Sequence, residues 1–199
     1  MIKIAAVAIA ICAISGCATT PTKPLPATAT EWADSCQVKD DKLEPAVRVQ
    51  CFTSPGFWDA GIGEGVIGQR RWLQAAVDRR SADTTVVIAL DIQHFASKAA
   101  GFNRGTYIGP DGKAQSATVS GRLANVHCSG GGRCEFSEQA TLLVNEADLR
   151  QFVATQPAST SWMARFGGSG RTVDLVFSGA EIRGFLLALD RQRGTQKPV

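Results

Sequence analysis

Cysteine and histidine are the residue types here whose chemistry depends most on spacing, and the chain has six cysteines and two histidines. Cys128 and Cys134 enclose the segment Ser-Gly-Gly-Gly-Arg, which could hold a metal, exchange electrons, bind an anion or be closed by a disulfide. A zinc site takes four ligands in close pairs, and His94 and His127 are the only histidines. The pair lacks the C-x-x-C spacing of thioredoxin-like motifs, and a tight turn needs glycines for positive φ without any anion. The spacing therefore favours a disulfide if the chain reaches an oxidising compartment.

The N-terminus has the pattern of an export signal. A single lysine is followed by an apolar run over residues 4–14, far shorter than the roughly 20 residues that a helix needs to span a bilayer. The run ends in Ile-Ser-Gly-Cys at 14–17, which resembles the lipobox of bacterial lipoproteins. The resemblance implies cleavage before Cys17 and lipid on its thiol and its amine, which would anchor the protein to a membrane. Ala18, in place of aspartate, implies sorting to the outer membrane, with the domain facing the periplasm.

The cysteine count then predicts two disulfides. With one cysteine in the cleaved signal and Cys17 lipidated, four remain, an even number for an extracytoplasmic domain. Of the three possible pairings we expect the two local ones, because the second pair flanks a hairpin turn: Cys36–Cys51 and Cys128–Cys134. We expect neither a metal nor another cofactor.

Composition and proline content divide the chain into segments. Of the 199 residues, 44% are hydrophobic and 20% charged, which suffices for an ordinary core in one domain. A net charge of +3 without a long basic run argues against nucleic-acid binding. We expect a signal peptide at 1–16, a lipidated cysteine and Pro/Thr-rich tether at 17–30, an irregular disulfide-bearing segment at 31–69, an α+β core domain at 70–191 and a flexible tail at 192–199.

Catalytic motifs are weak. The sequence Gly-Gly-Ser-Gly at 167–170 fails at the fifth position of the G-x-S-x-G nucleophile elbow. Residues 63–68 match G-x-G-x-x-G, but they follow loop residues rather than a strand, so we do not expect dinucleotide binding. His94 has the parity of a core residue in its strand, and His127 adjoins a cysteine. Spacing leaves open acid catalysis by carboxylates distant in the sequence. We expect no catalytic residues.

Alternating apolar residues predict a series of hairpins. Within 84–96 the alternation places Val86, Ile88, Leu90 and Ile92 on one face together with His94. His94 is therefore predicted to be a hydrogen-bonded residue of the core or its rim. The expected hairpins are 70–79 with 84–96, 116–127 with 134–144, and 161–166 with 171–177.

The predicted disulfide fixes a register for the second hairpin. If Cys128 lies opposite Cys134, Arg122 and Glu138 share a face as diagonal neighbours. That face also carries Leu142, so we predict that it is buried. Because a charge is seldom buried alone, we predict a partly buried ion pair between Arg122 and Glu138.

Two capping signals predict helices in the C-terminal half. Asn145 precedes an acidic first turn, and Ser178 with Glu181 forms a capping box. Each start is followed by an apolar stripe: Leu149, Phe152 and Val153 in the first helix, and Ile182, Phe185, Leu186 and Leu189 in the second. The expected fold class is α+β, a mainly antiparallel sheet of successive hairpins with these two helices packed on it.

This order of elements behind an export signal resembles a group of uncharacterised proteobacterial envelope proteins. The resemblance covers roughly residues 70–190, where a strand and helix like CEFSEQATLLVNEADL precede a hairpin and a final helix like GFLLALD. It implies no activity and no functional residues. We expect a non-enzymatic accessory or structural lipoprotein that docks on another envelope protein. The alternative is a binding or inhibitor module for a glycan, a small ligand or a cell-wall hydrolase, with a protruding loop at 54–68 or 128–134.

Overall fold

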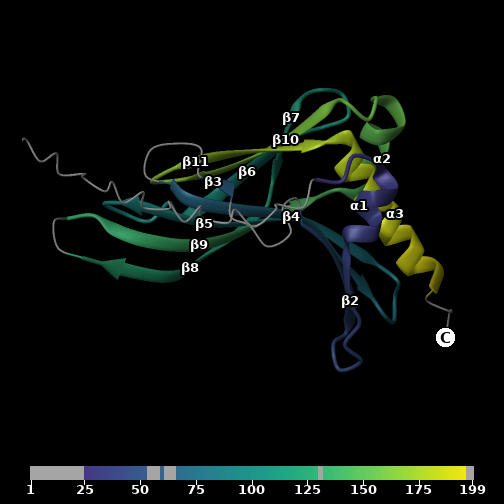
Figure 1. The fold of residues 1–199 in the computed structure, drawn as a ribbon, viewed down its shortest axis with the longest axis horizontal. Coiled ribbons are helices and arrows are strands. Elements are labelled where there is room, and N and C mark those ends of the chain that lie inside the picture. The colour runs from purple at the N-terminus through teal and green to yellow at the C-terminus, as the bar shows by residue number, and fades with distance from the viewer. Residues whose placement is uncertain (1–24, 53–58, 61–65, 130–131, 196–199) are drawn as a thin grey trace, which may run out of the picture.

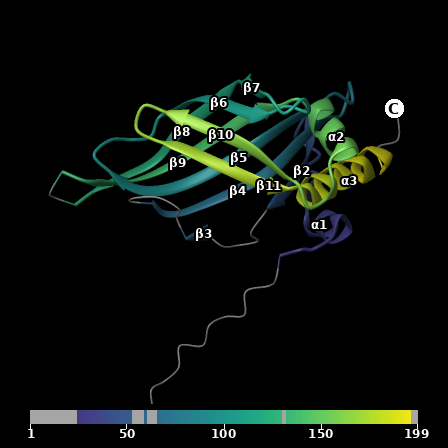
Figure 2. The same cartoon turned by 90° about the horizontal axis from the view of Figure 1, so that it is seen from above.

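Two antiparallel sheets lie face to face, and helices gather at one end of this sandwich (Figure 1, Figure 2). The structure, a computed structural model, describes residues 25–52, 59–60, 66–129 and 132–195. The larger sheet contains, in spatial order, β1 (Gln37–Lys39), β2 (Ala46–Phe52), β4 (Val66–Asp78), β5 (Thr84–Ala96), β9 (Cys134–Val144) and β8 (Val119–Cys128), with β3 (Asp59–Ala60) also paired to β4. The smaller sheet contains β11 (Thr172–Ser178), β10 (Ser161–Gly168), β6 (Phe102–Ile108) and β7 (Ala114–Ala117). The helices are α1 (Ala29–Ser35), α2 (Glu146–Thr155) and α3 (Gly179–Thr195).

The architecture confirms the broad α+β expectation. The predicted hairpins form as β4–β5, β8–β9 and β10–β11. The strands divide between two sheets because the chain leaves the larger sheet after β5, builds β6 and β7, and returns in β8. β9 then pairs with β5, so the two halves of the larger sheet are joined by a pairing between strands distant in the sequence.

The core lies between the two sheets and follows the predicted alternation. The inward residues of β5, from Val86 to His94, are at most 1% exposed. The smaller sheet contributes large side chains that are equally buried: Trp162, Phe166, Leu175 and Phe177. The indole N–H of Trp162 donates to the carbonyl of Ile108 at 2.6 Å, so its polar atom is satisfied inside the core.

Both predicted helix starts have the expected caps. Asn145 Oδ1 accepts from the Ala147 N–H at 2.9 Å. Ser178 Oγ accepts from the Glu181 N–H at 3.2 Å, and Glu181 Oε2 accepts from the Ser178 N–H at 2.6 Å. The apolar stripes pack inward as predicted, with Val153 half-buried and the other members buried: Leu149, Phe152, Ile182, Phe185, Leu186 and Leu189.

A third helix, α1, begins at the end of the predicted tether and continues into the segment predicted to be irregular, 31–69. Thr28 caps it, and Glu31 closes a full capping box. Trp32 packs against α3 at Gly184, where an added Cβ would lie 2.3 Å from the Trp32 Cβ. The T-x-x-E pattern at 28–31 is a helix-start signal that could have revealed this element.

Within the segment predicted to be irregular, 31–69, most of the described residues that follow α1 belong to the larger sheet. The segment contributes β1, β2 and β3 and the first residues of β4. In β2 the alternate residues Val47, Val49 and Cys51 are buried. These strands therefore share one core with the predicted 70–191 domain. The alternation in β2 is short and lies among prolines and glycines, which makes it a weak signal of a strand.

An ionic network joins the start of α2 to the end of α3. Glu146 accepts from Arg150 Nε at 2.7 Å and from Arg193 Nη1 and Nη2 at 2.8 and 2.7 Å. Arg193 also donates to Thr84 Oγ1 at 2.5 Å, which ties the helices to β5. Burial raises the pKa of Glu146, but hydrogen bonds from Arg193 and Arg150, with their charges, outweigh it and hold the pKa below its usual 4.5.

This network predicts an acid-sensitive contribution to stability. Because the folded-state pKa of Glu146 lies below the unfolded value, the contribution is complete above about pH 4.5 and is lost as the pH falls through the folded value. In urea unfolding at stepped pH, the stability difference between wild type and Glu146→Gln should narrow below about pH 4.5. Glu44→Gln, which breaks an exposed pair with Arg48, is the control and should show a small difference throughout. A Glu146→Gln difference that does not change with pH would contradict the prediction.

Candidate functional site

Both predicted disulfides form. Cys36–Cys51 joins the end of α1 to β2, and Cys128–Cys134 closes the tip of the β8–β9 hairpin, with Cα atoms 4.3 and 4.2 Å apart. The lipobox and Cys17 lie outside the described residues. Most of the candidate loop at 54–68 also lies outside them.

His94 and Glu138 form a buried pair between β5 and β9. His94 Nε2 lies 2.7 Å from Glu138 Oε1, and their side chains are 1% and 3% exposed. Glu138 also accepts the backbone N–H groups of Ala100 at 2.6 Å and Gly101 at 2.9 Å. His94 is thus a hydrogen-bonded core residue, as predicted. The predicted Arg122–Glu138 pair is wrong, because the glutamate is bound by these groups instead.

A β-bulge explains why Arg122 lies elsewhere. At the hairpin tip the register is the predicted one, with Val126 opposite Phe136. The register shifts by one residue after Leu123, so that Arg122 lies opposite Gln139. A one-residue shift turns a side chain to the other face of a sheet. Arg122 therefore lies on the outer face, which we define as the face of the larger sheet turned away from the smaller one.

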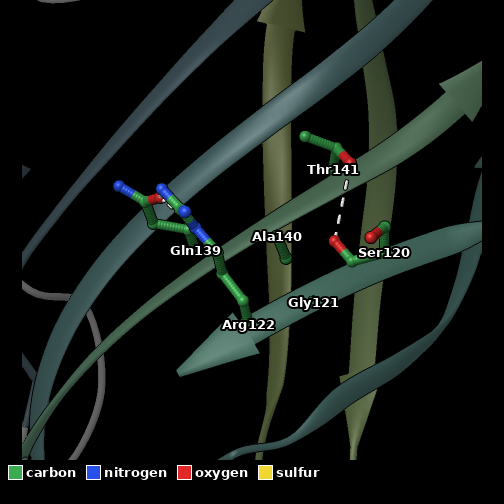
Figure 3. Close-up of a pocket in the computed structure, with 6 residues that line it drawn as sticks. All are labelled: Ser120, Gly121, Arg122, Gln139, Ala140 and Thr141. Carbon is green, nitrogen blue, oxygen red and sulfur yellow. Dashed lines mark hydrogen bonds between the residues drawn. The ribbon is translucent and has the colours of Figure 1, made fainter. Parts of the chain in front are cut away.

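Arg122 lines a hollow of about 300 Å³ between β8 and β9 (Figure 3). Its Nε donates to Gln139 Oε1 at 2.7 Å, and its Nη2 donates to the same oxygen. Thr141 Oγ1 donates to the Ser120 carbonyl at 3.5 Å. Because both hydrogen bonds go to a neutral amide, no negative charge in this contact offsets the guanidinium beside the hollow. The lining residues are Ser120, Gly121, Arg122, Gln139, Ala140 and Thr141.

The hollow is one end of a polar row across the outer face. The strand registers place its members side by side across β8, β9, β5 and β4: Arg122, Gln139, Asp91 and Arg70. Arg70 Nη2 donates to Asp91 Oδ2 at 2.5 Å. Asp91 is only 4% exposed, and its Oδ1 is buried without a hydrogen-bond partner in the described part of the chain. Such an acceptor is uncommon in a folded protein.

Aromatic side chains border this row beyond Arg70. The guanidinium of Arg70 lies over the rings of Phe52 and Trp72, 5.8 and 5.4 Å from their centroids. Gln74 Oε1 accepts from Gln50 Nε2 at 2.6 Å and from the Trp72 indole N–H at 3.4 Å. The outer face thus combines cations, amides, a buried carboxylate and half-buried rings. These groups suit recognition of a polar ligand.

The sequence did not predict a site on this face. The signal that could have marked Asp91 is a carboxylate within so apolar a strand, at the parity opposite that of His94. Gln139 and Arg70 carry no comparable signal, because they become neighbours of Asp91 only through the order of strands in the sheet.

Among the described residues no group of three or more His, Cys, Asp or Glu side chains could hold a metal ion. No described helix is long and apolar enough to cross a membrane. Comparison of the chain with protein-family models, curated proteins and solved structures finds no match.

Proposed function

We propose that this chain is a lipid-anchored protein of the outer membrane, facing the periplasm, with a non-enzymatic accessory role in the cell envelope. The observation that carries the proposal is the pairing of Cys36 with Cys51 and of Cys128 with Cys134. Structural disulfides persist in oxidising compartments. They therefore support export of a chain whose sequence at 14–17 resembles a lipobox.

The arrangement of the body suits an anchor at the N-terminal side. α1 lies at the helical end of the sandwich, and the disulfide-linked ends of β8 and β9 lie at the other end (Figure 1, Figure 2). α1 begins at Ala29, a short distance in sequence after Cys17. With lipid at that cysteine, the helical end would face the membrane, and the β8–β9 hairpin would extend into the periplasm toward a partner protein.

Replacement of Cys17 with alanine tests the proposal. Wild-type protein should fractionate with the outer membrane and yield an N-terminal peptide carrying acyl chains, since each buried CH₂ contributes about 0.8 kcal/mol to membrane binding. Cys17→Ala should lose both properties and should not retain an envelope partner in detergent pull-downs. Cys12→Ala, a change within the predicted signal, is the matched control and should be acylated normally. An intact initiator methionine or an unmodified Cys17 in the native protein would overturn the proposal.

A second candidate function is a binding module for a glycan, a small ligand or a cell-wall hydrolase. The hollow beside Arg122 favours it, because a charged guanidinium there belongs to a row of polar groups that also contains a buried carboxylate. Both candidates need the same lipid anchor. The first depends on docking to a partner protein, whereas the second depends on a ligand bound at the outer face.

A further inference from the structure

We propose that the hollow between β8 and β9 binds the carboxylate group of a glycan, with Arg122 as the residue that receives it. The inference rests on the binding function proposed as the second candidate, because it names the ligand class for that site. The hollow measures about 300 Å³, which is at the small end of the roughly 300 to 1,000 Å³ of ligand sites. This volume suits one or two sugar residues rather than a folded protein.

The guanidinium of Arg122 is held in place before any ligand arrives. Its Nε and Nη2 both donate to Gln139 Oε1, which fixes the plane of the group. The remaining N–H groups of Nη1 and Nη2 form the other edge of the plane, and two parallel N–H groups match the two oxygens of a carboxylate. Because Gln139 is uncharged, it orients the arginine without neutralising it. A preorganised donor loses less conformational entropy on binding than a free one.

The bulge in β8 is what creates this arrangement. Without the shift after Leu123, Arg122 would lie on the core side of the hairpin with Glu138. Bulges are found where a strand must redirect a side chain, often beside functional sites. Gly121, the residue before Arg122, passes so close to β6 that an added Cβ would lie 2.4 Å from the Phe102 carbonyl oxygen. This contact fixes the backbone of β8 immediately before the arginine.

The other polar groups around the hollow indicate a sugar acid rather than an inorganic anion. Ser120 and Thr141 bring hydroxyl groups, and Gln139 brings an amide, so neutral donors and acceptors surround the cation. Such groups pair with the ring hydroxyls and amides of a saccharide. An inorganic phosphate would use the arginine but would leave these neutral groups without partners from the ligand.

Asp91 limits how far a ligand extends along the polar row. It lies directly across from Gln139, but its side chain is 6% exposed and its Oδ1 is buried, so a ligand on the outer face does not reach that oxygen. Arg70 Nη2 donates to Oδ2. The inferred ligand contacts are therefore those of the hollow itself, the guanidinium of Arg122 with the neutral amide and hydroxyl groups beside it.

Calorimetric titration of the full lipidated chain in detergent micelles tests the inference. The probes are an N-acetylglucosamine–N-acetylmuramic acid disaccharide with a free carboxyl group, its methyl ester, and digalacturonate. The free acids should bind, and the ester should bind at least about tenfold more weakly, because a charge-assisted hydrogen bond is lost. Preference for one acid over the other identifies the sugar source.

Arg122→Gln should weaken binding of the free acid at least about tenfold while leaving binding of the ester nearly unchanged. Arg48→Gln is the matched control, since Arg48 is an exposed β2 arginine paired with Glu44 at 2.8 Å, and it should bind like wild type. Unfolding curves establish that both variants are folded. Equal binding of acid and ester, wild-type affinity in Arg122→Gln, or binding of an acidic peptide or phosphate in place of both sugars would overturn the inference. A chain that is acylated at Cys17 but fails to bind the sugar acids contradicts this inference alone, whereas an unmodified Cys17 contradicts the envelope function.

Discussion

Replacing Glu138 with glutamine should lower the free energy of unfolding by about 1 to 3 kcal/mol, the cost of leaving a buried hydrogen-bonding group without its partner. The Glu138 side chain is 3% exposed, its Oε1 lies 2.7 Å from His94 Nε2, and its carboxylate accepts from the N–H groups of Ala100 and Gly101. Glutamine has the same shape but one acceptor oxygen. Its amide group would direct N–H toward a donor, so at least one buried hydrogen bond would be replaced by a repulsive contact.

Glu135→Gln provides the matched control for this prediction. Glu135 is in the same strand but only half-buried, and its substitution should change stability by less than about 1 kcal/mol. Both variants are compared with wild type by urea unfolding near neutral pH. A loss below about 1 kcal/mol in Glu138→Gln would show that the carboxylate is not a major link between β9 and the segment after β5.

This buried pair also shows where sequence reasoning succeeds and where it stops. Alternation placed His94 on the core face of β5, and the cysteine register placed Glu138 on the buried face of β9. Both placements are correct. The partners were not predictable, because β5 and β9 become neighbours only after β6, β7 and β8 have been built between them.

Local signals predicted local structure well. The capping residues Asn145 and Ser178 mark α2 and α3, and the cysteine spacing gave both disulfides. The same kind of signal at Thr28 marks α1, a helix that was not predicted. The bulge in β8 was not predicted, and the expected register is wrong beyond it. A bulge depends on the pairing of the strand within the whole sheet, and no residue type near Leu123 indicates one.

The candidate site depends on that unpredicted feature. Asp91 could be assigned to the outer face from alternation, but its burial there requires neighbours from other strands. Arg122 reaches the same face only because of the register shift. A polar row drawn from four strands is a property of sheet order, so it emerges only when the tertiary structure is known.

The segment that Glu138 binds also contacts the end of β10 and the turn after it, which predicts a second large effect. Gly168→Ala should lower the free energy of unfolding by about 2 to 3 kcal/mol, as expected for overpacking against an atom that cannot retreat. An added Cβ would lie 2.1 Å from the Ala100 carbonyl oxygen, which also accepts the Gly170 N–H at 3.1 Å. Ala100 cannot move away easily, since Glu138 holds its N–H.

The neighbouring glycine supplies the control. A Cβ on Gly167 would lie 3.8 Å from Arg104, an ordinary contact, and neither Gly167 nor Gly168 has a positive φ. Gly167→Ala should therefore be neutral or slightly stabilising, because it restricts the unfolded chain. Both changes are measured by urea unfolding, together with the double variant Glu138→Gln/Gly168→Ala. Because Glu138 and Gly168 act on the same backbone at Ala100, the loss of unfolding free energy in the double variant should be smaller than the sum of the losses in the two single variants. Equal effects of the two glycine substitutions would mean that the contact with Ala100 relaxes freely, and strict additivity would mean that the two strands hold this segment independently.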